Sequence, residues 1–514
     1  MKAIVMQEES LTAADAQEYD EFGYQVSLWG DRALIGMPGD DDGKGAAYLF
    51  DYNGASWIQS AKLTVDDGVG GDEFGCDVSL EGDRALIGAR GDDSNSGSAY
   101  VFEFDGSVWS QRAKLTAIDG TEDDVFGESV SLLGNRALVG AYRDDDIDTD
   151  SGAAYVFEVA GEVWTQTAKL VPSDGAGNDW FGWSVSLSNN RALIGAIWDD
   201  EKGIDSGSAY IFDFNGSEWI QTTKLISSDG EAGDNFGNSV GLLNNRALVG
   251  AVLDDDYGSY SGSAYVFDFN GVSWSQTTKL TPDDGMTFDN FGVTVSLSDD
   301  RLLIGASYDE VNIGRSGSAY VYDYNGSTWK RTLKLTANDG ANEDFFGWGA
   351  SISGDRVLIG SPGDDNNGTN SGSSYVFDLS TIDFSEYSIT AAQTGSWFDP
   401  AQSGHGLAVE ILSENRALIY WYVYDDMGNQ VWLLGSGTYS GDTITADMVI
   451  TRGGMFPPNF NNGVVETDIW GSVVLIFENC HSGQFSWEPV NNSNFQSGQM
   501  PIQRLTMPLG LSCD

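Results

Sequence analysis

A repeat of 52 to 55 residues constrains this chain more than any other feature. Each copy runs from a Phe-Gly dipeptide through the same order of apolar stretches and turns. In the fifth copy these stretches are residues 238–243, 246–251, 263–269 and 274–280, and an Asn-Gly turn joins the last two, which is a strong hairpin signal. Four antiparallel strands repeated seven times predict an all-β chain with a seven-bladed β-propeller. The seven dipeptides begin at Phe22, Phe74, Phe126, Phe181, Phe236, Phe291 and Phe346.

The two ends of the repeat array indicate how the ring closes. The seventh unit has no clear fourth strand, whereas residues 7–23 match residues 111–127 without a gap. We therefore expect residues 4–11 to supply the missing strand of the last blade, which removes an open sheet edge. The propeller is predicted over residues 1–385, and residues 386–514 carry strand patterns of a small antiparallel β-domain, either a sandwich or a barrel.

The repeated motifs resemble the FG-GAP repeat family, which forms the propeller of integrin α-subunits and of many bacterial surface proteins. The resemblance rests on Phe-Gly followed by Gly-Ala or a relative, such as Gly88-Ala89, in seven units over residues 1 to about 380. It implies a binding scaffold with varied ligands. Many members carry a DxDxDG calcium loop between strands one and two, but here that link is a short turn such as Asn244-Asn245. The family's usual calcium sites are therefore not expected.

The C-terminal region and its cysteines point to an oxidising compartment. Its motifs GSWFDPAQSGHG and IYWYVYDDMGNQVWLLGSG resemble a β-module of secreted proteins from Gram-negative bacteria. Cys480 and Cys513 lie close together near the end and are predicted to form a disulfide, whereas Cys76 stands alone. We expect a secreted or cell-surface bacterial protein, although no apolar signal segment is visible, so that any signal would lie upstream.

The charge balance excludes several partners. The 25 Lys and Arg residues face 78 Asp and Glu residues, a net charge of −53. Such a chain repels nucleic acids and anionic membranes, and no apolar run reaches the roughly 18 residues of a membrane span. We expect no nucleic-acid binding and no membrane insertion, and a monomer. A divalent cation, a cationic partner and a surface adapted to high salt remain open.

Acidic residues recur in the two loops of each blade that share one face of a propeller. Ca²⁺ takes six to eight oxygen ligands, so these carboxylates are candidate ligands for Ca²⁺, which is the one cofactor expected. The alternative is that each Asp caps a tight turn through hydrogen bonds to the backbone. The candidate metal ligands are Asp67, Asp72, Asp119, Asp124, Asp174, Asp179, Asp229, Asp234, Asp284, Asp289, Asp339 and Asp344.

Positions that break the repeat are the candidates for ligand binding, because the scaffold does not fix them. Aromatic residues at such positions on the acidic face could form a platform for sugar rings or a protein loop, and drift at tolerant loop positions is the alternative. The candidates are Tyr142, Trp183, Trp198, Tyr308 and Trp348.

Together these patterns predict a non-catalytic binding or adhesion protein that uses the acidic face to bind a glycan or a protein, with or without Ca²⁺. Two alternatives remain: a hydrolase or lyase that acts on polysaccharide, and a purely structural repeat of the cell envelope. The propeller has no His and its carboxylates recur in every blade, which disfavours an enzyme. A single Asp or Glu with a strongly shifted pKa in the central channel would favour one.

Overall fold

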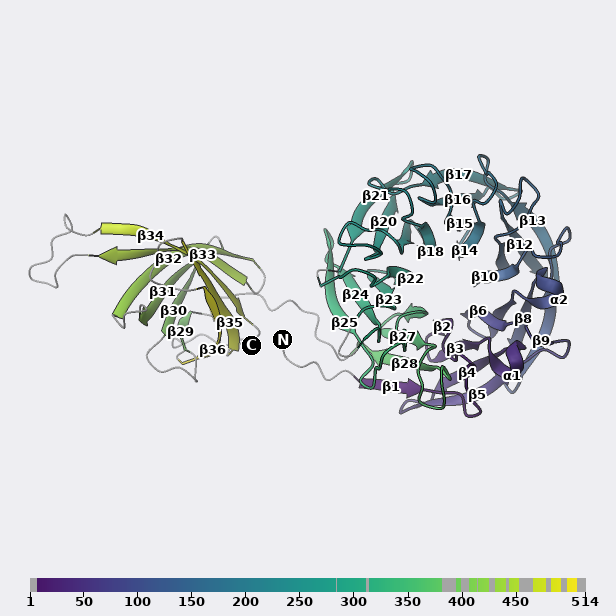
Figure 1. Cartoon of the computed structure of the whole chain (residues 1–514), viewed down its shortest axis with the longest axis horizontal. Helices are drawn as coiled ribbons and strands as arrows, with labels where there is room; N and C mark the ends of the chain where they lie inside the picture. The colour runs from purple at the N-terminus through teal and green to yellow at the C-terminus, as the bar shows by residue number, and fades with distance from the viewer. Residues whose placement is uncertain are drawn as a thin grey trace, which may run out of the picture. The chain divides into compact units, whose positions relative to one another are not determined.

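The chain forms two compact units, Met6–Thr381 and a second that holds Ile382–Asp514. The first is a seven-bladed β-propeller and the second is a closed barrel of eight strands, so the predicted all-β class is confirmed and the choice between sandwich and barrel is settled (Figure 1). The computed structural model describes residues 7–282, 284–310, 314–380, 394–398, 406–413, 415–424, 430–440, 443–452, 466–477, 482–490 and 497–505.

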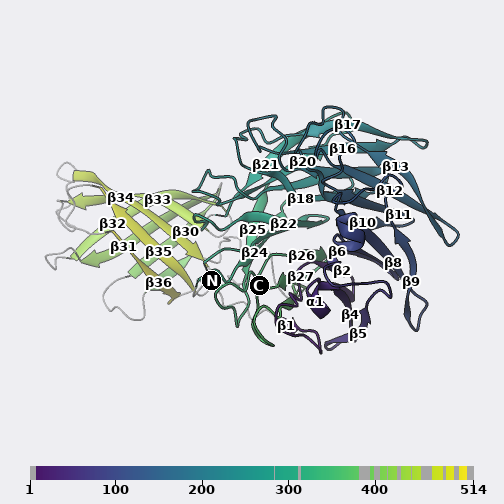
Figure 2. The same ribbon diagram turned by 45° about the vertical axis from the view of Figure 1, so that its right-hand side comes forward.

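Six blades each hold four consecutive antiparallel strands, the first innermost and the fourth at the rim (Figures 1 and 2). Blades one to three are β2 (Val26–Trp29), β3 (Arg32–Met37), β4 (Ala46–Tyr52), β5 (Trp57–Leu63); β6 (Phe74–Glu81), β7 (Arg84–Ala89), β8 (Ser98–Phe104), β9 (Trp109–Leu115); and β10 (Phe126–Leu133), β11 (Arg136–Ala141), β12 (Ala153–Ala160), β13 (Val163–Leu170). Blades four to six are β14 (Phe181–Ser188), β15 (Arg191–Ala196), β16 (Ser208–Phe214), β17 (Trp219–Leu225); β18 (Phe236–Leu243), β19 (Arg246–Ala251), β20 (Ser263–Phe269), β21 (Trp274–Leu280); and β22 (Phe291–Ser298), β23 (Arg301–Ala306), β24 (Ser318–Tyr324), β25 (Trp329–Leu335).

Two one-turn helices, α1 (Asp40–Gly43) and α2 (Asp92–Asn95), lie in the loops between strands two and three of the first two blades. Within the described ranges, no helix has the length and apolar character needed to cross a membrane.

The seventh blade takes its outermost strand from the other end of the repeat array. It consists of β26 (Ala350–Ser353), β27 (Arg356–Ser361) and β28 (Ser373–Asp378), and β1 (Gln7–Leu11) pairs antiparallel with β28. Residues 4–6 of the predicted closing strand lie outside the described residues. In this register Ser10 lies opposite Tyr375, where every other blade places a Lys opposite the equivalent Tyr.

The Phe-Gly dipeptide packs each blade against its own third strand. In the fourth blade, Phe181 is wholly buried and its ring meets Tyr210 and Phe212 edge-on, with centroids 5.5 and 6.0 Å away. Gly182 follows at φ +97°, and a Cβ there would collide with the carbonyl oxygen of Ala153 in the preceding blade. The repeat therefore keeps Gly because neighbouring backbones touch at this point.

The Arg that begins each second strand joins one blade to the next. The guanidinium of Arg191 donates through Nε to Asp213 at 2.6 Å and through Nη1 to the carbonyl of Asn244 in the next blade at 3.1 Å. It also lies 5.0 Å from the ring of Trp274 at the rim of that blade. Since Arg356 contacts the Gly30 carbonyl and Trp57 in the same way, these contacts run across the closure of the ring.

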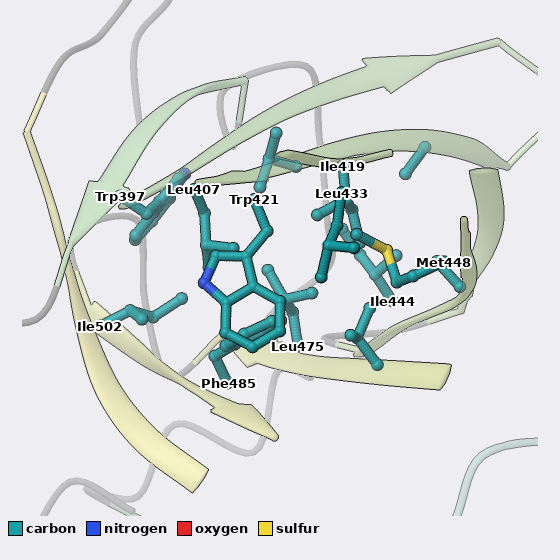
Figure 3. Packing of buried hydrophobic residues seen from close by; sticks show 14 of the residues in the cluster. Trp397, Leu407, Ile419, Trp421, Leu433, Ile444, Met448, Leu475, Phe485 and Ile502 are labelled. Carbon is teal, nitrogen blue, oxygen red and sulfur yellow. The ribbon is translucent and has the colours of Figure 1, made fainter. Parts of the chain in front are cut away.

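The barrel encloses one apolar core. Its strands are β29 (Gly395–Phe398), β30 (Gly406–Leu412), β31 (Arg416–Tyr424), β32 (Gln430–Ser440), β33 (Thr443–Arg452), β34 (Glu466–Phe477), β35 (Ser482–Pro489) and β36 (Gly498–Arg504). Pairing of β29 with β36 closes it. Trp421 lies in this core beside Phe485, with ring centroids 4.9 Å apart (Figure 3). The Trp470 ring lies 5.4 Å from that of Trp421. The predicted disulfide, Cys480 to Cys513, falls outside the described residues.

Candidate functional site

The turn around each Phe-Gly brings two variable side chains together. The residue before Phe has a left-handed backbone with φ between +55° and +59° in all seven blades, although none of the seven is Gly. Its carbonyl accepts the N–H of the residue after Gly, as between Trp180 and Trp183 at 3.3 Å. A left-handed backbone costs a bulky side chain about 1–2 kcal/mol, so these are strained positions that carry side chains. The seven residues are Glu21, Glu73, Val125, Trp180, Asn235, Asn290 and Phe345.

A third variable position joins this pair from the loop between strands two and three. The second residue after Gly-Ala donates its backbone N–H to the carbonyl of the Asp that stands two residues before Phe. In the fourth blade this bond runs from Trp198 to Asp179, and in the third from Arg143 to Asp124, both at 3.3 Å. This third position carries a side chain in blades three to six, where it is Arg143, Trp198, Leu253 or Tyr308, and it is Gly in the other three blades.

The mouth holds an aromatic group between the third and fourth blades, which we name the tryptophan cluster: Tyr142, Arg143, Trp180, Trp183 and Trp198. Trp180 stacks on Trp198 with ring centroids 3.4 Å apart and on Trp183 at 5.4 Å and an interplanar angle of 18°. Tyr142 closes the group at 4.8 Å from Trp180. The three indoles are half-buried, so each keeps a solvent-facing part beside the stack.

Two hydrogen-bond donors in the tryptophan cluster lack a partner. The Arg143 guanidinium lies 5.3 Å from the Tyr142 ring and 5.8 Å from the Trp180 ring. Its Nε and the indole Nε1 of Trp180 are both buried without an acceptor. Among the described residues, no carboxylate lies within ion-pair distance of Arg143. Each buried donor without an acceptor costs about 1–3 kcal/mol of folding stability. A group that accepts hydrogen bonds would therefore be stabilised at this point of the tryptophan cluster.

A second aromatic group lies across the ring, on blades six, seven and one. Phe345 lies 5.0 Å from Tyr308 and 6.4 Å from Trp348, and Trp348 lies 5.8 Å from Tyr24. The five predicted ligand-binding residues therefore fall into two groups, Tyr142, Trp183 and Trp198 in one and Tyr308 and Trp348 in the other.

The sequence interpretation missed Trp180 and Phe345. Each lies between the predicted residues of its own group: Trp180 contacts Trp183 and Trp198, and Phe345 contacts Tyr308 and Trp348. The signal that could have found them is their position directly before Phe-Gly, because the turn brings that residue beside the one after Gly.

Between the two aromatic groups, on the side of blades one to three, lies a cluster of three charged side chains: Glu73, Arg90 and Glu128. Arg90 binds Glu73 at 2.5 Å and Glu128 at 3.2 Å, and its guanidinium lies 5.9 Å from the ring of Tyr24. Burial raises the pKa of Glu128, and the nearby guanidinium counteracts part of that rise. These contacts occupy Arg90 within the protein, in contrast to Arg143.

The first Asp of each predicted metal pair is held by a Lys or a Tyr. In the fourth blade Lys224 lies 2.9 Å from both Asp174 and the buried Asp199, and the Tyr210 hydroxyl donates to Asp199 at 2.7 Å. Equivalent lysines bind the equivalent aspartates of five other blades. These aspartates are Asp15, Asp67, Asp119, Asp229 and Asp284.

The seventh blade differs because Ser10 stands in place of the lysine. There the Tyr375 hydroxyl lies 2.9 Å from both Asp339 and Asp364.

The second Asp of each predicted pair holds a loop together. The Asp179 carboxylate accepts the backbone N–H of Ala176 at 2.7 Å, and the same contact recurs at the other six positions. Burial raises the pKa of Asp179 to about 6. Asp72, Asp124, Asp234, Asp289 and Asp344 are also buried, each with a raised pKa.

These contacts match the alternative interpretation, in which Asp residues organise turns. In the part of the chain that the structure covers, no group of three or more His, Cys, Asp or Glu side chains is arranged to hold a metal ion. Calcium binding by these loops stays a prediction.

One carboxylate in the innermost layer has a strongly shifted pKa. Burial raises the pKa of Asp77 to about 7. Its two oxygens accept the backbone N–H groups of Val78 at 2.8 Å and Val130 at 2.6 Å, so it links the innermost strands β6 and β10. In the fifth blade the Ser239 hydroxyl makes the same link to Val295. The environment of Asp77 is thus that of a structural bridge between blades.

Comparison with known proteins agrees with the geometry of the ring. The FG-GAP repeat model matches the chain seven times, once for each repeat unit of the propeller. The matches cover residues 5–50, 57–102, 109–157, 164–212, 219–267, 274–322 and 329–377. No match to the chain was found among curated proteins. Since the seven matches cover more than half of the residues, the chain belongs to the FG-GAP repeat family.

Proposed function

We propose that this protein is a non-catalytic binding protein of the cell surface or the extracellular space, and that its propeller binds a glycan at the tryptophan cluster. The observation that carries the proposal is the stack of three half-buried indoles, Trp180, Trp183 and Trp198, at the mouth of the ring. The C–H faces of sugar rings pack on such indoles, and binding sites combine apolar surface with a few placed polar groups.

Binding accounts for the site better than catalysis does. Glycoside hydrolysis needs two carboxyl groups that can reach one bond and exchange protons with it. Both oxygens of Asp77 already accept backbone N–H groups, and Glu73 and Glu128 share the guanidinium of Arg90. Within the part of the chain that the structure describes, the three indoles of the tryptophan cluster are in no ion pair, and each is partly exposed, so their exposed surface is available to a ligand.

The test uses two glycine substitutions at equivalent positions. Trp180→Gly removes the central indole, and Asn235→Gly alters the same left-handed position, φ +56°, in the next blade without removing an aromatic ring. Gly suits both backbones, so folding is preserved at the turn itself. On a glycan array probed with the full chain, we expect Trp180→Gly to lower binding at least tenfold and Asn235→Gly to change it less than twofold.

Other results would reject the proposal. Equal binding by Trp180→Gly and the unaltered chain would place the ligand elsewhere. Release of shortened glycans, detected by mass spectrometry after incubation, would favour the hydrolase or lyase alternative. No bound glycan, together with capture of a protein that depends on Trp180, would favour a protein ligand.

A further inference from the structure

We propose that the glycan is acidic, and that Arg143 and the indole N–H of Trp180 bind its carboxylate group. This inference rests on the proposed function, because it names the class of ligand for the same tryptophan cluster. The ligand would be a saccharide with a uronic acid or another carboxylated sugar, with one sugar ring on the indoles and the carboxylate at the guanidinium.

The first argument is the chemistry of the two unpartnered groups. The Nε of Arg143 and the Nε1 of Trp180 can only donate hydrogen bonds, so neither can satisfy the other. They lie in one cluster, with the guanidinium carbon 5.8 Å from the Trp180 ring. A carboxylate is acceptor-only and has two oxygens, so it could accept from both groups. Both donors are buried in this structure, so binding requires the Arg143 side chain to move aside as the carboxylate enters.

The second argument is the contrast with other arginines that are half-buried like Arg143. Every Arg that begins a second strand lies within 4.0 Å of a carboxylate, as Arg136 does with Glu158 at 2.6 Å. Arg90, which stands after Gly-Ala in the second blade, binds two Glu residues. Within the described ranges Arg143 has no carboxylate partner, in a chain with 78 acidic and 25 basic residues. An external carboxylate supplies the missing partner.

The net charge of −53 does not oppose this assignment at short range. Charges on the surface are screened over about 8 Å at physiological ionic strength, so the acidic loops slow the approach of an anion more than they weaken its contact. Arg143 binds at closer range, where its planar guanidinium can form two parallel hydrogen bonds to a carboxylate.

The experiment compares each acidic glycan with its neutral methyl ester. The array carries oligosaccharides of uronic acids, the same oligosaccharides with every carboxylate esterified, and neutral glycans without carboxylates. We expect the full chain to bind an acidic member at least tenfold more tightly than its ester. Arg143→Gln should lower affinity for the acid at least tenfold and leave affinity for the ester within twofold.

A matched control removes one positive charge from the same loops. Lys202 is exposed, lies in the fourth blade and has no ion pair among the described residues, so Lys202→Gln should change binding of the acid less than twofold. Arg143→Lys keeps the charge but loses the planar pair of donors, and should restore only part of the affinity.

The outcomes separate this inference from the proposed function. Equal binding of acid and ester, both lost in Trp180→Gly, would overturn the inference and leave the glycan site in place. Equal losses in Arg143→Gln and Lys202→Gln would show a general charge effect and would also overturn it. No binding of any glycan would reject both proposals.

Discussion

The contact of Lys224 with Asp199 allows a quantitative prediction about what holds each blade together. Lys224→Met keeps most of the side-chain volume but removes the ammonium group from the buried Asp199, whose side chain is 5% exposed. Breaking one partner of a buried ion pair costs about 3–5 kcal/mol. Because Tyr210 still donates to Asp199, we expect a loss near the lower end, about 3 kcal/mol.

This loss translates into a measurable change in melting temperature. Unfolding entropy near 60 °C is about 2.1 cal/mol/K per residue, so the roughly 375 residues of the propeller give about 0.8 kcal/mol/K. A loss of 3 kcal/mol then lowers the Tm by about 4 °C. Differential scanning calorimetry of the full chain measures it, and Lys202→Met, which removes an exposed lysine of the same blade, is the control.

The pH dependence of the variant gives an independent check. Burial alone would raise the pKa of Asp199, but hydrogen bonds from Tyr210 and Lys224 outweigh it and lower the pKa. Without Lys224 this pKa rises, so protonation stabilises the folded variant and the deficit in Tm should shrink as the pH falls from 7 to 5. A deficit below about 1 °C at pH 7 would show that the ion pair contributes little, and a larger deficit independent of pH would show that the loss does not come from the charge of Asp199.

Three further predictions concern the ring. Four aspartates have pKa values of about 6 in the folded state, compared with about 3.9 in the unfolded state, so the folded state binds protons more tightly. The Tm of the propeller should therefore rise as the pH falls from 8 to 5, and a steady fall of the Tm over this range would contradict the prediction. The aspartates concerned are Asp179, Asp234, Asp289 and Asp344. In six blades a lysine binds the first Asp of the acidic loop, as Lys224 binds Asp174, whereas Asp339 of the seventh blade has no lysine at that position. Any rise of Tm in millimolar Ca²⁺ over EDTA should therefore vanish in Asp339→Asn and persist in Asp174→Asn. The reverse pattern would place the cation at a lysine-bound Asp. Deletion of residues 1–11 removes the β1–β28 ladder and the buried Leu11, which should cost at least about 5 kcal/mol and lower the Tm by about 6 °C, whereas an unchanged Tm would mean that three strands suffice for the seventh blade.

The sequence predicted best what all seven units share. Phe-Gly and the Arg of the second strand recur in all seven units, and the Trp of the fourth strand recurs in six, because each makes the same contact between or within blades. The period alone therefore indicates their structural role. The barrel was harder to predict, since alternating apolar residues suit a sandwich equally well. Closure depends on the pairing of β29 with β36, strands about 100 residues apart, and no local pattern encodes that pairing.

The candidate site was predicted only in part, for a reason of backbone geometry. Trp180 and Phe345 lie at φ +55° and +56°, a conformation that bulky residues rarely adopt, so nothing in their residue type suggests the turn that brings them beside Trp183 and Trp348. The partners of the acidic loops were missed because Lys224 reaches Asp174, 50 residues earlier, and this contact follows from strand register rather than from spacing within one unit.

The pairing of β1 with β28 also affects the order of events during synthesis. Ribosomes add about 5–20 residues per second, so Gln7–Leu11 leaves the ribosome roughly 20–70 s before its partner Ser373–Asp378 exists. During that interval the nascent chain carries this strand unpaired. Glu8 and Glu9 place two negative charges on that strand, which discourages pairing with the edges of neighbouring nascent chains on the same polysome. Once Ser373–Asp378 has emerged, β1 and β28 can pair and close the ring.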